Sequence, residues 1–306
     1  MFDGLDLPHG IYPYLVSPVS PDGSIREPVL GRLVEDLIAA GVQGVTPLGS
    51  TGEVSFLTAP QRRRIVEVTL EAAAGRVPVV PGVAAFSTTD AVAQARLYEQ
   101  LGANGLVVMR QSAGPVSEEG VQAYFAAAAA AVGLPIILYT NPAVLGTDLS
   151  IQTLDGLTEL ANVRYIKDAT SDTGRILSYS NRYAGRLQVF SASAHIPMFV
   201  FMLGGVGWMA GPACVIPDAA LRLHRLTASG RFDEALSLQR KTWAVNEVFR
   251  KYPLGACIKA ALECRGYDVG GPVEPQLPLE AAAVREIRRA LEIVDAAMAQ
   301  PDGDAK

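Results

Sequence analysis

Cysteine, lysine and charged residues in general are scarce in this chain of 306 residues. Three cysteines, Cys214, Cys257 and Cys264, are too few and too widely spaced for a disulfide framework or a zinc site, and they favour a reducing cytoplasm. Charged residues make up 19% of the chain and the formal net charge is −5, which argues against a nucleic acid or an anionic membrane as the main partner.

Two kinds of targeting or anchoring segment are also missing. The apolar stretches, such as residues 196–210, are broken by Gly and Pro and are too short to span a bilayer. The first ten residues hold two Asp and no basic cluster ahead of an apolar run, so they do not form a secretory signal. A soluble, cytoplasmic protein is therefore expected.

What is present is an α/β alternation. Short, mostly continuous apolar runs, typical of strands in a buried parallel sheet, alternate with longer Ala-, Leu- and Glu-rich stretches. Eight such units favour a (β/α)8 TIM barrel of about 250 residues, with an open doubly wound sheet as the alternative. The predicted strands are Ile11–Ser17, Gly44–Leu48, Val77–Gly82, Gly105–Met109, Pro135–Tyr139, Arg164–Lys167, Leu187–Ser191 and Val206–Ala210.

The predicted helices fill the intervals and continue after the last strand. Thr58 and Ser117 are candidate N-caps for two of them. We expect a barrel over residues 1–230, a three-helix C-terminal extension over 231–300 and a frayed tail at 301–306. The clearest helical stretches are Val29–Ala40, Ala59–Ala74, Thr89–Leu101, Glu118–Val132, Pro217–Gly230, Arg231–Lys251, Gly255–Arg265 and Leu279–Met298.

Lys167 ends the sixth predicted strand and is the only lysine in the first 240 residues. Arginine supplies every other permanently cationic side chain there, so surface charge does not explain this lysine. A desolvated amine has a lowered pKa and attacks carbonyl carbons, which a guanidinium cannot do. The alternative is a buried structural lysine paired with Asp168 or Asp172.

Two further segments at strand ends carry polar groups suited to a keto acid. Gly49–Ser50–Thr51–Gly52–Glu53 offers backbone N–H groups and two hydroxyls without Lys or Arg, which suits a carboxylate better than a phosphate, although an ordinary glycine turn has the same composition. Tyr139 offers a phenol for proton transfer, although a buried tyrosine of the core is the commoner situation.

Taken together and in this order, these segments resemble the dihydrodipicolinate synthase and N-acetylneuraminate lyase family of class I aldolases. The resemblance runs from about Gly10 to Gly266, most of the chain, and includes the glycine-rich residues 204–207. It implies a (β/α)8 barrel that forms a Schiff base with pyruvate or a related 2-keto acid. It also implies that no metal or organic cofactor is needed, and that the chain forms a homotetramer or dimer.

The resemblance assigns roles to five residues. Lys167 would form the imine with the keto carbon, and Tyr139 would shuttle protons to and from the carbinolamine. Ser50 and Thr51, with the adjoining Gly49, would hold the carboxylate. The protonated imine then acts as an electron sink, so that C3 of the keto acid can lose a proton or a carbon substituent.

Several positions depart from the family pattern in the half of the site that receives the aldehyde. Dihydrodipicolinate synthases carry an Arg that binds the aldehyde's carboxylate, and Val144 stands at that position here. Their relay tyrosine from a neighbouring subunit is missing from residues 110–114, where Arg110 offers only a substitute charge. Both changes argue against a role in lysine biosynthesis.

Sialic-acid lyases place acidic side chains after the seventh strand, where this chain has none. Ser193 and His195 are the polar candidates there for a second substrate, and His195 is also a structural candidate as a lone histidine before a helix. Trp208 and Met209, in the eighth predicted strand, are expected either to line an apolar wall of the substrate site or to belong to the core. These changes indicate a less polar acceptor.

The sequence therefore predicts a lyase that cleaves or forms an aldol bond with pyruvate or a related 2-keto acid and an unassigned aldehyde. One alternative is a 2-keto-3-deoxy sugar acid dehydratase, which uses the same imine to expel a hydroxyl group. A second is dihydrodipicolinate synthase with a rebuilt aldehyde site. A third, outside enzymology, is a keto-acid-binding barrel without turnover.

Overall fold

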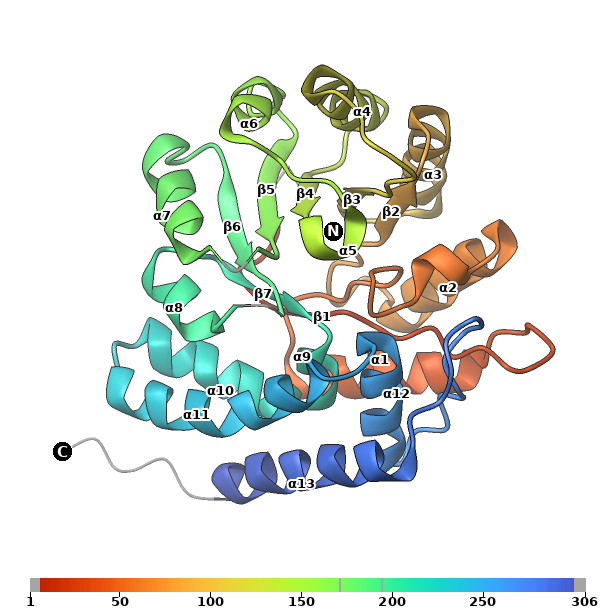
Figure 1. Ribbon diagram of the computed structural model, residues 1–306, viewed down its shortest axis with the longest axis vertical. Coiled ribbons are helices and arrows are strands. Elements are labelled where there is room, and N and C mark those ends of the chain that lie inside the picture. Colours follow the sequence, from red (N-terminus) through yellow and green to blue (C-terminus); the bar gives the residue numbers. More distant parts are fainter. Residues whose placement is uncertain (1–5, 171, 194, 300–306) are drawn as a thin grey trace.

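A computed structural model describes residues 6–170, 172–193 and 195–299. In this part of the chain, seven strands form one curled, all-parallel sheet in the order β1-β7-β6-β5-β4-β3-β2 (Figure 1). The first strand, β1, pairs with the last, β7, so the first and last β/α units of the described structure are neighbours. The strands are β1 (Gly10–Pro13), β2 (Gly82–Ala85), β3 (Leu106–Arg110), β4 (Ile136–Thr140), β5 (Val163–Asp168), β6 (Gln188–Ser191) and β7 (Gly207–Ala210).

The segment predicted as the second strand, residues 44–48, lies between β1 and β2 without forming a regular strand. It makes two isolated parallel bridges, Tyr14 with Thr46 and Val45 with Val79. The predicted third strand is likewise irregular up to Gly82, where β2 begins. The reason is Pro47 and the two prolines at 78 and 81, since proline has no N–H to give to a ladder.

Helices surround the sheet, as the sequence predicts (Figure 1). Thr58 and Gln61 form the reciprocal capping box at the start of α2, and Ser117 caps α4 by accepting from the N–H of Gly120. The longer helices are α1 (Glu27–Ala40), α2 (Ala59–Ala73), α3 (Thr88–Leu101), α4 (Glu118–Ala130), α6 (Ile151–Leu157), α7 (Thr173–Arg182), α8 (Pro197–Met202) and α10 (Pro217–Ala228), and the short ones are η1 (Val54–Phe56), α5 (Pro142–Leu145) and α9 (Pro212–Val215).

In the described residues, three helices follow α10: α11 (Phe232–Phe249), α12 (Leu254–Cys264) and α13 (Ala281–Met298). Figure 1 shows α11 beside α10 and α13 as the outermost layer on that side. The expected frayed tail, 301–306, lies outside the described residues. None of the helices within residues 6–299 that are described combines the length and the apolar character needed to cross a bilayer.

Aromatic rings fill the interior of the sheet in a layer below the strand ends. The rings of Tyr12 and Tyr165 each lie 5.4 Å from that of Phe190. An added Cβ on Gly44 would lie 2.0 Å from the Tyr12 ring, so a glycine is needed where this ring crosses residues 44–48. Side chains of a strand alternate between its two faces, so the next inward layer holds Tyr14, two residues after Tyr12, and Lys167, two after Tyr165.

Candidate active site

Lys167 lies inside the sheet near the carboxyl end of β5, directly opposite Tyr139 of β4 in the strand register. Its side chain is enclosed by two aromatic rings: Nζ is 3.9 Å from the ring centroid of Tyr139 and 4.0 Å from that of Tyr14. The residue is 5% exposed. Its amine is thus buried among phenol rings at the end of the sheet where catalytic groups of α/β enzymes gather.

Burial lowers the pKa of Lys167 to about 7, because the charged ammonium loses its hydration. The two rings favour the cation, but desolvation is the larger effect. The structural alternative does not hold: Asp168 accepts from Tyr179 (2.9 Å) and pairs with Arg175 (3.4 Å), while Asp172 caps α7. The lowered pKa favours the uncharged amine, which is the form that can attack a carbonyl carbon.

Tyr139 presents a phenol to this amine. Its hydroxyl accepts a hydrogen bond from Nδ2 of Asn141 at 2.9 Å, which leaves the phenol's own proton available for donation. Burial raises the pKa of Tyr139, and hydrogen bonds with the Asn141 amide and the Ser50 hydroxyl oppose that rise. The phenol is consequently protonated at neutral pH and is placed to donate to an oxygen bound near Nζ.

The loop at residues 49–53 supplies hydroxyls on the same side of the sheet. The Ser50 hydroxyl is buried beside the phenol of Tyr139, and Thr51 is 3% exposed. The hydroxyl of Ser17 donates to the carbonyl of Gly52 (2.6 Å) and fixes the loop against the segment after β1. A Cβ on Gly49 would lie 2.0 Å from the Tyr14 ring, which explains the glycine there.

A buried ion pair ties the same loop to the C-terminal helices. Glu53, with a left-handed φ of 56°, places Oε2 2.7 Å from Nζ of Lys259 on α12, and the two side chains are 0% and 2% exposed. The other carboxylate oxygen accepts from the N–H of Val273 (2.8 Å), and Lys259 donates to the carbonyl of Gly271 (2.7 Å). The loop that carries Ser50 is thereby held by residues more than 200 positions later in the chain.

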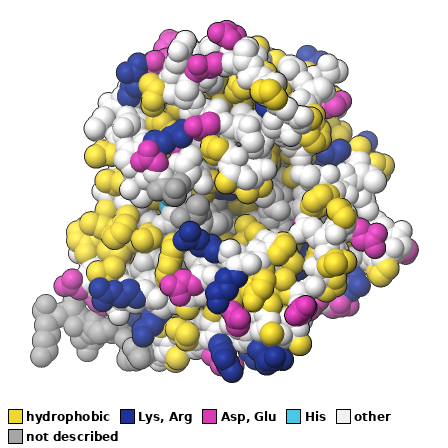
Figure 2. All heavy atoms as spheres, viewed as in Figure 1, with side chains coloured by type: hydrophobic (Ala, Val, Ile, Leu, Met, Phe, Trp, Pro, Cys, Tyr) yellow, Lys and Arg dark blue, Asp and Glu magenta, His cyan; other side chains and the backbone are white. Residues whose placement is uncertain are grey.

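These groups share one cavity of about 940 Å³. Figure 2 shows a hollow near the centre of this face, with hydrophobic side chains beside it. In the described residues, its charged lining consists of Lys167, Glu53 (already paired) and Arg250. The polar lining comprises Tyr14, Ser50, Thr51, Ser55, Gln111, Ser112, Tyr139, Asn141, Ser193, Asn246 and Gln276, and the exposed apolar lining comprises Phe56, Phe86 and Val144.

The model of the dihydrodipicolinate synthetase family matches residues 7–294. This chain belongs to that family. A 4-hydroxy-tetrahydrodipicolinate synthase from Hyphomonas neptunium is 32% identical over 293 residues, 95% of this chain and 97% of that protein. The match extends beyond the expected Gly266 and takes in most of α13, so the C-terminal helices are part of the family's length.

Solved structures agree with this membership. The 4-hydroxy-tetrahydrodipicolinate synthase of Methylacidiphilum fumariolicum SolV has a TM-score of 0.91 at 26% identity, over 95% of this chain and 97% of that one. A dihydrodipicolinate synthase of Acinetobacter baumannii, complexed with pyruvate, has a TM-score of 0.89 at 27% identity, over 95% and 99%. As a member of the dihydrodipicolinate synthetase family, the chain is a lyase.

The structure of this family member brings together some of the predicted site residues and separates others. Lys167, Tyr139, Ser50 and Thr51 share the cavity, together with Val144 and Ser193. Five candidates lie outside its described lining, one of them Gly49, which faces the Tyr14 ring. Arg110 is 6% exposed and donates a hydrogen bond to Thr147 (2.8 Å). His195 is 2% exposed and lies beside Ala192, whose carbonyl accepts a hydrogen bond from Trp208 (3.3 Å). Met209 is fully buried.

Alternation along the strands explains these placements. Arg110 follows Met109, which lines the cavity, so its side chain leaves on the opposite face of β3, toward Thr147. Trp208 lies outside for the same reason, one residue after the inward Gly207. Met209 points inward, but it is buried in the core rather than exposed to the cavity.

The sequence interpretation missed Tyr14, Phe56, Phe86, Asn246 and Arg250, which also line the cavity. Tyr14 directly follows β1, so a systematic reading of every strand end would have found it. Arg250 and Asn246 are on or just after α11, in a part of the chain where no strand end directs attention to them. Only the packing of that helix across the mouth of the sheet reveals them.

Proposed function

We propose that this enzyme is a class I lyase that forms an imine between Lys167 and pyruvate or a related 2-keto acid, and that it makes or breaks an aldol bond at C3. The observation that carries the proposal is the amine of Lys167, buried between two phenol rings with a pKa of about 7. The pyruvate complex of the Acinetobacter baumannii relative supports the choice of keto acid.

In the proposed reaction the neutral amine adds to C2 of the keto acid, and the N–H proton passes to the former carbonyl oxygen. A second proton on that oxygen lets it leave as water, and the remaining C=N bond carries the positive charge. Loss of a proton or of a carbon substituent from C3 then gives the enamine, whose electron pair can add to an aldehyde in the opposite direction. Tyr139 transfers the protons at the oxygen.

The hydroxyls of Ser50 and Thr51 bind the keto acid's carboxylate in this proposal. The Ser50 hydroxyl is buried in the cavity lining beside the Tyr139 phenol, and a buried polar group in such a position is stabilised when a ligand supplies a further hydrogen bond. With Glu53 paired to Lys259, the loop adds no uncompensated negative charge that would repel a carboxylate.

The acceptor end of the cavity supports an aldehyde with an apolar part. Val144 stands where dihydrodipicolinate synthases have their carboxylate-binding arginine, and it is 66% exposed. Phe56 and Phe86, 42% and 60% exposed, add apolar surface to the same lining. We infer that the aldehyde differs from that of the relatives named 4-hydroxy-tetrahydrodipicolinate synthase.

We also propose that the sheet is a closed (β/α)8 barrel, with residues 44–48 as the eighth strand. The bridges of this segment to Tyr14 and Val79, on its two sides, support closure. Residues 231–300 would then be the appended helical region, held to the barrel in part by the Glu53–Lys259 ion pair. Assembly into a homotetramer or dimer stays a prediction.

The test of imine formation is borohydride reduction in the presence of pyruvate, followed by mass spectrometry of the peptides. We expect a reduced pyruvate adduct, located on Lys167 and absent from the sample without pyruvate. Folded enzyme that gives no adduct would leave a keto-acid-binding protein without turnover as the better description.

The acceptor is identified by incubating the enzyme and pyruvate with a panel of aldehydes that range from aspartate semialdehyde to aromatic aldehydes. We expect condensation with the less polar members. Condensation with aspartate semialdehyde alone would instead indicate dihydrodipicolinate synthase with a rebuilt site. In a parallel incubation with 2-keto-3-deoxy sugar acids, a dehydrated product without released pyruvate would indicate the dehydratase.

The pH dependence of imine formation follows from the lowered pKa of Lys167. Only the neutral amine attacks, so the rate of adduct formation should rise about tenfold per pH unit below pH 7 and level off above it. The measurement is the initial rate of trapping between pH 5 and 9 at fixed pyruvate concentration. A rate that continues to rise tenfold per unit up to pH 9 would mean that the amine has the pKa of an ordinary lysine.

A further inference from the structure

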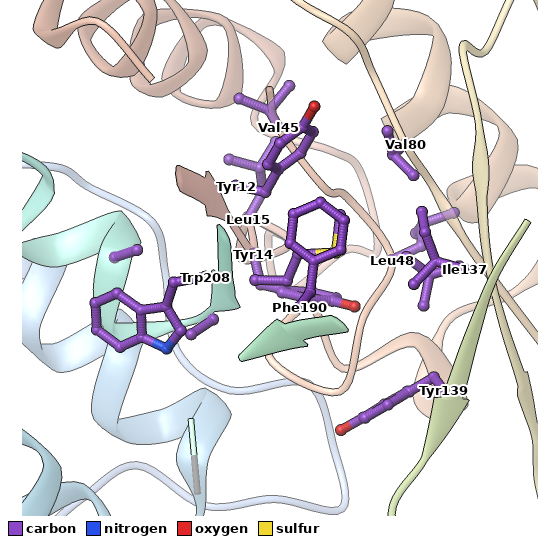
Figure 3. Packing of buried hydrophobic residues seen from close by; sticks show 14 of the residues in the cluster. Tyr12, Tyr14, Leu15, Val45, Leu48, Val80, Ile137, Tyr139, Phe190 and Trp208 are labelled. Carbon is purple, nitrogen blue, oxygen red and sulfur yellow. The ribbon is translucent and has the colours of Figure 1, made fainter. Parts of the chain in front are cut away.

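Tyr14 brings a second phenol to the amine of Lys167. It directly follows β1, on the side of the sheet away from β4, and Figure 3 shows Tyr14 and Tyr139 entering the interior from different elements. The distances from Nζ to the two ring centroids are nearly equal, 4.0 Å for Tyr14 and 3.9 Å for Tyr139. The two rings therefore flank the amine, although only Tyr139 has a role in the reaction proposed above.

The hydroxyl of Tyr14 is the unusual part of this arrangement. The residue is 1% exposed, and its hydroxyl is buried with no hydrogen-bond partner in the described structure. The comparable tyrosine of the layer below, Tyr12, donates to the carbonyl of Pro8 at 2.8 Å, as a buried phenol normally does. A buried hydroxyl without a partner destabilises the fold, so a phenylalanine would serve the packing better.

The neighbouring loop leaves space for the Tyr14 ring. Gly49, the first residue of the loop that carries Ser50, leaves room for the Tyr14 ring, since a Cβ there would lie 2.0 Å from it. The ring thus contacts both the loop at Gly49 and the Lys167 amine, and it lines the 940 Å³ cavity. The amine nitrogen that would attack the keto acid lies 4.0 Å from the centroid of this ring.

We propose that Tyr14 is a further catalytic residue, whose hydroxyl donates a hydrogen bond to the C2 oxygen of the keto acid as Lys167 attacks. This inference rests on the proposed imine chemistry. Burial and the neighbouring Tyr139 raise the pKa of Tyr14 well above its usual value, so the phenol stays protonated and acts as a donor rather than as a base.

The hydrogen bond from Tyr14 stabilises the addition step, in which negative charge develops on the C2 oxygen of the keto acid. When the nitrogen lone pair forms the bond to C2, the electron pair of the C=O bond moves to oxygen, and a fixed donor at that oxygen stabilises it. Tyr139 then delivers the protons that let the oxygen leave as water, and Tyr14 keeps its own proton throughout. The missing partner of the Tyr14 hydroxyl is, on this account, the substrate.

The experiment compares the wild type with Tyr14→Phe and, as the matched control, Tyr12→Phe. The rate of exchange of pyruvate methyl protons in D₂O, followed by NMR, reports imine and enamine formation without any need to know the aldehyde. Thermal unfolding of the free enzymes is measured in parallel. Tyr14→Phe should slow exchange by about tenfold to a hundredfold, which is the range for loss of one aligned donor, while its unfolding midpoint stays equal to the wild type's or rises.

Tyr12→Phe should show the reverse pattern: exchange within twofold of the wild type and a lower unfolding midpoint, because it loses a satisfied hydrogen bond. Exchange by Tyr14→Phe within twofold of the wild type would overturn the inference, and so would a loss of stability equal to that of Tyr12→Phe, which would mean a structural hydroxyl. Failure of the wild type to form a borohydride-trapped adduct on Lys167 would instead overturn the imine chemistry itself.

Discussion

Replacing Lys167 with methionine is expected to abolish the reaction with pyruvate without unfolding the protein. Methionine fills a similar volume between the rings of Tyr14 and Tyr139 but cannot attack a carbonyl carbon. Loss of an attacking nucleophile lowers turnover by about 10⁴-fold or more in enzymes that use covalent intermediates. We therefore expect no adduct on borohydride reduction and no exchange of pyruvate methyl protons above the background rate.

The stability of Lys167→Met distinguishes a catalytic lysine from a structural one. In the folded enzyme the pKa of Lys167 is lowered to about 7, so burial of its charge costs free energy below that pH, and the cost diminishes as pH rises from 7 toward the pKa of the unfolded chain. The free energy of unfolding of Lys167→Met should thus equal or exceed that of the wild type, most clearly below pH 7.

Lys241→Met, which removes an exposed lysine of α11, is the matched control and should leave activity and stability unchanged. A large loss of stability in Lys167→Met alone would mean that the amine holds the fold together, and the proposed chemistry would then lose its main support.

Replacing Lys259 with methionine is expected to cause the largest loss of stability of the variants considered. Glu53 would lose its cationic partner in a site where both side chains of the pair are almost completely buried. Breaking a buried ion pair from one side costs about 3–5 kcal/mol. Because Glu53 ends the loop that carries Ser50 and Thr51, we also expect weaker binding of pyruvate by the variant that remains folded.

Two further variants make this prediction specific. Lys251→Met makes the same side-chain change in an exposed ion pair with Glu286, where the side chains are 55% and 38% exposed, and should lower the free energy of unfolding far less than Lys259→Met does. Adding Glu53→Gln to Lys259→Met removes the unbalanced charge and should restore part of the lost stability. The measurement is urea-induced unfolding of all four proteins. Equal losses for Lys259→Met and Lys251→Met would show that the buried pair has no special importance.

The sequence predicts the repeating architecture and the nucleophile well because both depend on local patterns. Continuous apolar runs place β3 to β7 within a residue or two of the predicted strands, and the capping box at Thr58 is determined by residues three positions apart. The prediction of strands fails at the prolines at 47, 78 and 81. The backbone there stays extended, but proline lacks the N–H group that a regular strand ladder needs.

By itself, then, the sequence determined the order of most strands and helices, the single lysine of the first 240 residues and its place at the end of a strand. Only the tertiary structure decided what surrounds that lysine: the unpartnered hydroxyl of Tyr14, the outward path of Arg110 and the ion pair between Glu53 and Lys259. Local patterns follow from hydrogen bonding and periodicity along the chain. The pKa of a buried amine follows from groups far apart in sequence, because desolvation and charge act through space.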